Sequence, residues 1–294
     1  MVFYFTGTGN SLYIAKQLES QPVSIPQALK SNSLMFSADK IGIVCPVYGH
    51  EMPKMVKDFI KKTSFQTKYF YIILTYGALH GGAAELARDY VKSVGKQVDY
   101  IASIMMVDNF LPNFDMVEQC AMDKNILKNL DRIKADIENH VCKIEKAKFK
   151  DKMIHKGYLA MVKHQDETVW AKFKVGDNCT GCGICAKVCP ANTVVIENGM
   201  AVHTLGNCQA CYACVHACPQ KAIGFTIDEK NPKARYRNEN VTLEEAKEEL
   251  VKSINEYFSE IAKTCASRSN CIRAKVGAVI VGEDKKIKII KKEK

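Results

Sequence analysis

Short apolar runs alternate with helical patterns over the first 150 positions of the chain. The runs rich in β-branched and aromatic residues span 2–5, 33–36 (the weakest), 41–47, 69–76 and 98–107, and the helical patterns lie near 11–19, 53–61, 82–94 and 117–148. In the last pattern, apolar residues from Ile126 to Ile144 recur at intervals of three and four, as on one buried helix face. Strands that alternate with helices form parallel sheets covered on both faces. The pattern predicts a small doubly wound α/β domain with a five-stranded parallel sheet over residues 1–150.

The chain after residue 240 shows a further helix and strand pattern. Thr242 and Glu245 have the spacing of a capping box, and an apolar stripe at helical intervals follows from Leu243 to Ile261. A β-rich run, Val276–Val281, and a lysine-rich end complete the sequence. We expect domains at residues 1–150 and 172–240, a linker at 151–171 between them, and a helix and strand segment at 241–294.

Composition places the chain among globular proteins, since 47% of its 294 residues are apolar and 25% are charged. The longest apolar stretch, Tyr69 to Leu79, is too short for a bilayer span, and no basic region precedes the apolar start. We therefore expect a cytoplasmic protein without a signal peptide or membrane partner. The formal charge of +10 is spread along the chain rather than gathered in a stripe, so nucleic acid is not an expected partner.

Eight of the thirteen cysteines lie in two matching runs. Each run reads C-x-x-C-x-x-C-x-x-x-C-P, and the second begins 29 residues after the first. Thiolate sulfur is the soft ligand that iron–sulfur clusters need, and in this arrangement the fourth cysteine of each run ligates the other cluster. We therefore expect two 4Fe–4S clusters. The expected ligands are Cys179, Cys182, Cys185 and Cys218 for one cluster, and Cys208, Cys211, Cys214 and Cys189 for the other.

A pair of four-cysteine zinc sites is the main alternative. Such sites usually use two separated C-x-x-C pairs rather than three cysteines followed by Cys-Pro, and a redox C-x-x-C pair explains only half of the ligands. Residues 172–228 resemble bacterial two-cluster ferredoxins in every ligand and in both prolines, Pro190 and Pro219. The resemblance implies an α+β ferredoxin domain that transfers electrons.

Residues 6–11 form a loop between the first apolar run and the first helical pattern. They are Thr6, Gly7, Thr8, Gly9, Asn10 and Ser11. Backbone amides at a helix start, aided by hydroxyl groups, bind phosphate. The loop has neither the dinucleotide-binding nor the Walker pattern. An ordinary capped turn without a ligand is the alternative.

This loop resembles the FMN-phosphate loop of flavodoxins, and the resemblance extends over residues 1–150. It implies that the flavin ring lies between the loops after the third and fourth strands, where Tyr48 and Tyr76 would stack on it. Gly49 would permit a peptide flip, and Gly77 lies in the second of these loops. The tryptophan that many flavodoxins place on the ring is missing, since Trp170 is the only tryptophan in the chain. As an alternative, both tyrosines are ordinary core or surface aromatics.

The combined architecture resembles the flavodoxin–ferredoxin fusions called ferrodoxins, found mostly in anaerobic bacteria; residues 108–111 and 235–238 also fit that family. It implies a relay of electrons between FMN and two 4Fe–4S clusters, as a carrier or reductase component for a redox partner protein. Residues 264–282 resemble the opening of deoxycytidylate deaminases, but neither H-x-E nor P-C-x-x-C follows, so we expect a truncated, non-catalytic segment. A self-contained flavoenzyme that reduces a small substrate and a redox-regulated deaminase fusion remain as alternatives.

Overall fold

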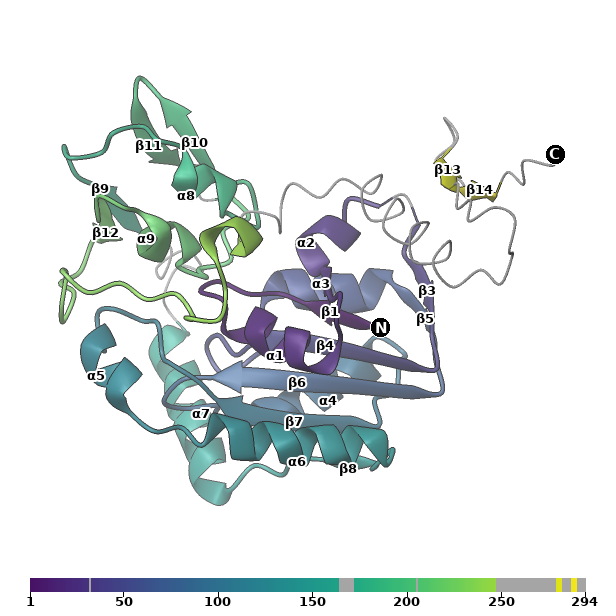
Figure 1. Cartoon of the computed structure of the whole chain (residues 1–294). Helices are drawn as coiled ribbons and strands as arrows, with labels where there is room; N and C mark the ends of the chain where they lie inside the picture. Colours follow the sequence, from purple (N-terminus) through teal and green to yellow (C-terminus); the bar gives the residue numbers. More distant parts are fainter. Residues whose placement is uncertain (32, 164–171, 205, 247–278, 282–286, 290–294) are drawn as a thin grey trace.

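The computed structural model describes residues 1–31, 33–163, 172–204, 206–246, 279–281 and 287–289. Its main feature is a six-stranded sheet in which every neighbouring pair of strands is parallel. The strands lie in the order β2-β1-β4-β6-β7-β8 and are β1 (Val2–Tyr4), β2 (Val23–Ser24), β4 (Lys40–Pro46), β6 (Tyr69–Tyr76), β7 (Tyr100–Met105) and β8 (Lys143–Ile144). Because they are parallel, the strands all end at the same edge of the sheet, on the left in Figure 1.

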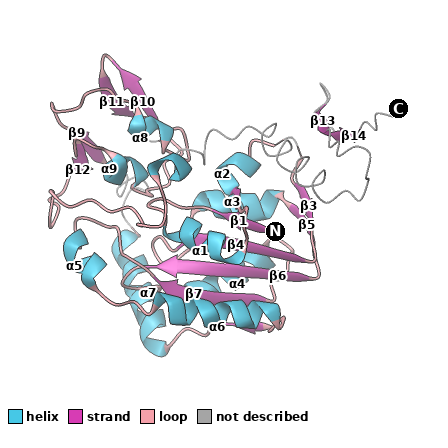
Figure 2. Ribbon diagram, in the orientation of Figure 1, coloured by secondary structure: helices cyan, strands magenta, loops and turns pink. Residues whose placement is uncertain are grey.

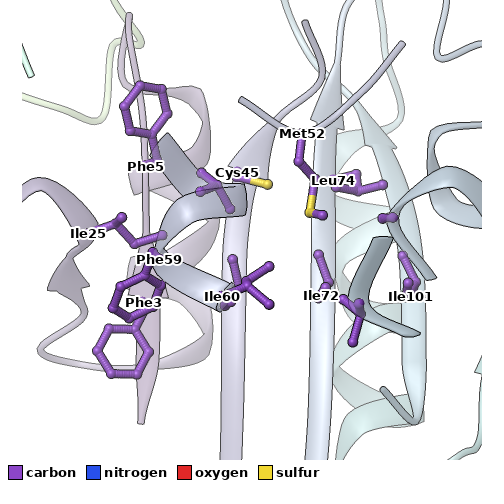
Figure 3. Close-up of a cluster of buried hydrophobic side chains, with 14 of the residues drawn as sticks. Phe3, Phe5, Ile25, Cys45, Met52, Phe59, Ile60, Ile72, Leu74 and Ile101 are labelled. Carbon is purple, nitrogen blue, oxygen red and sulfur yellow. The ribbon is translucent and has the colours of Figure 1, made fainter. Parts of the chain in front are cut away.

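Helices cover both faces of this sheet (Figure 2). They are α1 (Asn10–Leu18), α2 (Ile25–Ala28), α3 (Lys54–Lys62), α4 (Ala83–Ser93) and α6 (Ile126–Glu138). Since successive strand residues point to opposite faces, Ile72 of β6 joins a core with α3 and α4, whereas Ile73 joins a second core with α1 and α6. Figure 3 shows the first core, where the ring centroids of Phe3 and Phe59 are 5.0 Å apart.

Four of the five predicted strands are present, as β1, β4, β6 and β7. The five-stranded count is wrong, because the two-residue strands β2 and β8 complete a sheet of six. The weak run at 33–36 does not join that sheet, since β3 (Met35–Ser37) pairs with β5 (Ser64–Gln66) in a separate two-stranded sheet. Two residues are too few to show an alternation of apolar and polar positions, so no pattern predicts β2 or β8.

The single helix predicted at 117–148 is also wrong. Two helices occupy this part of the chain, α5 (Met116–Ala121) and α6, and Asn125 before α6 has a positive φ of 49° that a continuous helix does not allow. His140, with φ 52°, follows the end of α6. The apolar stripe of α6 itself is buried as predicted, but Ile144 lies in β8 instead of on the helix face.

The cysteine-rich part of the chain forms a small ferredoxin-like segment with a third apolar core. Its elements are β9 (Phe173–Val175), α8 (Ile184–Lys187), β10 (Val194–Glu197), β11 (Met200–His203), α9 (Ala213–Ala217) and β12 (Ile223–Phe225). β10 pairs with β11 and β9 pairs with β12, both antiparallel. Each cysteine run forms a loop, then a short helix, then a strand, so the sequence repeat is also a structural repeat.

This segment lies beside the edge at which the parallel strands end (Figure 1). Leu111 and Met116, from the chain after β7, complete its core. The contact places the second cysteine loop next to the loop that follows β1, and α9 next to the chain that follows β7.

Little of the chain after residue 246 lies among the described residues. Thr242 and Glu245 form the predicted capping box, since the Glu245 N–H donates to Thr242 Oγ1 and the Thr242 N–H donates to Glu245 Oε2. The rest of that predicted helix and most of segment 264–282 lie outside the described part; within it, β13 (Val279–Val281) pairs with β14 (Ile287–Ile289). No helix of the described residues is long and apolar enough to cross a lipid bilayer.

Candidate metal centres and anion site

Four cysteines line a small void in the ferredoxin-like segment. Cys179, Cys182 and Cys185 come from the first loop, and Cys218 follows α9 of the second copy. We call these four residues the first quartet. Three members therefore come from one copy of the repeat and one from the other, which is the crossed pattern that the spacing predicts.

A second small void is lined by the other four cysteines. Cys208, Cys211 and Cys214 come from the second loop and Cys189 from the first copy; we call them the second quartet. A four-iron cube needs four thiolates around a space rather than around one point, and both quartets surround such a space. Within the described residues, no three His, Cys, Asp or Glu side chains are close enough to hold a single metal ion.

The two crossing cysteines accept matching hydrogen bonds. The Thr193 N–H donates to Cys189 Sγ and the Ala222 N–H donates to Cys218 Sγ, both at 3.3 Å. Hydrogen bonds to ligand sulfur tune the reduction potential of a cluster. The second quartet has an additional neighbour, because His203 Nε2 lies 3.5 Å from the sulfur of Cys214.

Burial keeps the thiols of Cys185 and Cys214 protonated while no metal is bound. It raises the pKa of Cys185 to about 11, and it raises the pKa of Cys214 well above that of an exposed thiol. Neighbouring cysteines of the quartets raise both pKa values further. Since thiolates are the ligands of iron, cluster assembly at neutral pH releases protons from the quartets.

Comparison with known families agrees with this geometry. Residues 171–238 match the family model of a 4Fe-4S dicluster domain. This dicluster domain covers both quartets and supports iron–sulfur electron transfer as the chemistry of this part of the chain. The match spans less than half of the sequence, and no curated protein matches the chain.

The loop at residues 6–11 ends in a helix start that lacks a side-chain cap. Gly9, with φ 93°, precedes α1, and its N–H donates to Thr6 Oγ1 at 3.1 Å. In the described structure, the backbone N–H groups of Thr8, Asn10 and Ser11 have no acceptor, although Thr8 and Ser11 are buried. Unpaired backbone amides at a buried helix start are groups that can bind an anion.

The side chains of this loop are held by partners far away in the sequence. Ser11 Oγ lies 2.9 Å from Thr75 Oγ1 at the end of β6. Asn109 Nδ2, from the chain after β7, donates to Thr8 Oγ1 at 3.2 Å. These two contacts fix the positions of the Thr8 and Ser11 hydroxyl groups.

The chain that leaves the dicluster domain crosses over the same loop. Tyr236 OH donates to Asn10 Oδ1 at 2.6 Å, and the Asn238 N–H donates to the Thr8 carbonyl at 2.8 Å. A Cβ on Gly9 would lie 3.1 Å from the side chains of Asn238 and Val241. We call residues 236–241 the strap. Sequence reasoning noted 235–238 and 108–111 only as family resemblances, and the structure shows that both segments contact the loop at residues 6–11.

The loops after β4 and β6 lie at the same edge of the sheet. Tyr48 OH would lie 3.1 Å from a Cβ on Gly7, whereas Tyr76 packs edge-on against His80 with ring centroids 4.9 Å apart. Tyr48 thus lies next to the loop at residues 6–11. Gly49 has a φ of 55°, which glycine adopts at little cost.

Gly77 is packed against an acidic side chain that sequence reasoning did not assign to the site. A Cβ at this position would clash with the Asp108 carboxylate, which accepts hydrogen bonds from the N–H groups of Ala78 and Phe110. Burial raises the pKa of Asp108, and the two amide hydrogen bonds oppose that rise. Asp108 thereby fixes the loop after β6.

Helix α7 (Phe149–Val162) covers these loops, although its residues from 151 onward were expected to form a linker. A Cβ added to Gly49 would overlap Tyr158 OH, and the ring centroids of Tyr158 and His50 are 4.9 Å apart. His155 Nδ1 lies 3.3 Å from His50 Nδ1. No side chain of α7 is fully buried, and no regular apolar stripe marks it in the sequence. An aromatic side chain of α7 therefore packs on the loop that follows β4.

Proposed function

We propose that this chain relays electrons between FMN and two 4Fe–4S clusters and serves a redox partner protein as carrier or reductase component. One observation carries the proposal. The uncapped helix start at residues 6–11 lies directly against the second quartet, because a Cβ on Gly7 would overlap the carbonyl oxygen of Cys211. A phosphate held by this loop would bring its flavin to the edge of the sheet that the second quartet borders.

The strand order supports FMN as the ligand. The first five strands of the sheet, β2-β1-β4-β6-β7, follow the 2-1-3-4-5 order of flavodoxin-like folds, in which FMN binds beyond the carboxyl ends of the strands. The loop at residues 6–11 lies at that position, directly after β1. Clusters carry single electrons, and FMN would link one- and two-electron chemistry. The residues of the chain bind the phosphate, hold the ring and exclude water.

The position of helix α7 favours a protein as the redox partner rather than a small-molecule substrate. Tyr158 and His155 lie over the predicted ring position, so a substrate would meet the helix before the ring. The deaminase alternative concerns segment 264–282, most of which lies outside the described residues, and no observation favours it.

Anaerobic cofactor analysis tests the proposal. We expect about eight irons, eight sulfides and one FMN per chain, with no zinc. A colourless protein loaded with zinc would exclude the clusters. Absence of flavin after reconstitution with FMN would exclude the relay while leaving the clusters in place.

Gly7→Ala is expected to weaken FMN binding about tenfold or more. The added Cβ meets a backbone carbonyl that cannot rotate away, and overpacking of this kind costs about 1–3 kcal/mol. The fluorescence of the FMN that is released when the protein is diluted measures the affinity of the chain for FMN. Gly157→Ala is the matched control, because a Cβ there meets open space within α7 and alanine favours a helix. Equal FMN affinity in the two variants would contradict the assignment.

A further inference from the structure

We propose that the two quartets have different tasks, a proposal that rests on the function above. The cluster of the first quartet is the port at which single electrons pass to and from an external carrier. The cluster of the second quartet works inside the molecule, between that port and the flavin site. Each exchange at the port moves one electron: the reduced cluster is oxidised by one electron and the oxidised carrier is reduced by one, with no bond or proton transferred.

The second quartet lies within the interface between the dicluster domain and the sheet. Besides the contact between Gly7 and Cys211, the Met55 N–H donates to Gln209 Oε1 at 2.8 Å. Cys189, Cys211 and Cys214 are 7%, 7% and 8% exposed, and Cys208 is partly exposed. A cluster in this position is next to the flavin site and shielded from large molecules.

The first quartet lies closer to solvent. Cys182 is exposed, Cys179 and Cys218 are partly exposed, and Cys185 is buried. The side chains that line its void carry no charge, and Ile196 at the rim is 37% exposed. A carrier whose own redox centre lies in an uncharged surface can approach this cluster without desolvating charged groups.

The flavin site is the other possible port, but α7 covers it. Tyr158 packs on Gly49 and His50, and Lys152 of the same helix forms an ion pair with Glu85 of α4 at 2.8 Å. Electrons from a large carrier therefore reach the flavin through the two clusters in series.

A charge placed beside the cluster that exchanges electrons with external carriers changes the rate at which a charged oxidant reaches that cluster. This rate can be measured on the full chain with its cofactors bound. Three exposed apolar residues are each replaced by lysine: Ile196 beside the first quartet, Leu159 on α7, and Leu127 on α6 as the matched distant control. Each reduced protein is mixed with hexacyanoferrate(III), a trianion, in a stopped-flow spectrometer. A new positive charge at the port should raise the bimolecular rate about three- to tenfold at low ionic strength, and 0.5 M salt should remove the gain.

We expect Ile196→Lys alone to accelerate oxidation. Acceleration by Leu159→Lys equal to or above that of Ile196→Lys would make the flavin the port and overturn the proposal, as would identical rates for all three variants. A potentiometric titration gives a readout that is independent of turnover: Ile196→Lys should raise the midpoint potential of one cluster and leave the other cluster and the flavin unchanged. Absence of FMN would defeat the proposed function, yet the comparison of Ile196→Lys with Leu127→Lys would still report on the clusters.

Discussion

Cys189→Ser is expected to lower the iron content from about eight to about four atoms per chain and to remove the cluster of the second quartet. Cys189 belongs to the first run in sequence, but in the structure it lines the void of Cys208, Cys211 and Cys214. Serine is a poor ligand for cluster iron, because its oxygen is harder than sulfur and is protonated at neutral pH. Iron and sulfide analysis of the anaerobically purified variant measures the loss.

Double substitutions identify which cluster is lost. If Cys189 serves the second quartet, Cys189→Ser combined with Cys208→Ser still leaves about four irons, whereas Cys189→Ser combined with Cys182→Ser leaves almost none. An uncrossed arrangement reverses the two results and would show that each run holds its own cluster. Cys142→Ser is the control, since Cys142 is exposed and lines neither void; it should retain all eight irons.

The cysteine ligands were predictable because their chemistry is local in the sequence. Three cysteines at intervals of three, followed by Cys-Pro, restrict a loop around a cluster wherever the loop lies in the fold. The structure places the eight cysteines around two voids in the crossed pattern. That all eight bind iron stays a prediction, which Cys189→Ser and its double variants test.

The surroundings of the loop at residues 6–11 were not predictable in the same way. Asn10 contacts Tyr236, 226 positions later, and Asn109 contacts Thr8, 101 positions earlier in the chain. Contacts at such separation leave no periodic pattern in a single sequence, and asparagine or tyrosine at these positions has many uses. The sequence therefore predicted a phosphate loop, but not the strap that holds it.

Helix α7 shows a second reason for failure. Sequence patterns find helices through an apolar stripe that one face buries, but α7 has no fully buried side chain, and Phe149 is 81% exposed. Its fixed points are polar or aromatic, as in the contacts of His155 and Tyr158 with His50. A helix that is held in place by only a few polar or aromatic contacts has no apolar stripe, so its sequence resembles that of a linker.

His216→Ala is expected to lower the free energy of unfolding by about 3 kcal/mol. His216 lies in α9 and is 8% exposed. Its Nδ1 accepts the Tyr236 N–H at 3.0 Å, so Nε2 carries the proton and donates to the Asn109 carbonyl at 2.8 Å. Burial lowers the pKa of His216 to about 4, so the ring is neutral at pH 7. Alanine leaves a buried donor and a buried acceptor without partners.

This one imidazole joins the dicluster domain to both segments that hold the loop at residues 6–11. Asn109 donates to Thr8 and Tyr236 donates to Asn10, so the loss of His216 should also speed FMN release, while iron content stays at about eight because no ligand is removed. His140→Ala, at an exposed position, should change the unfolding free energy by about 1 kcal/mol or less. Chemical denaturation of both variants measures the free energy of unfolding, and the rate of flavin release from both variants tests the predicted effect on FMN. If His216→Ala has the same unfolding free energy as the unmodified chain, the hydrogen bonds of His216 do not stabilise the contact between the dicluster domain and the segments that hold the loop at residues 6–11.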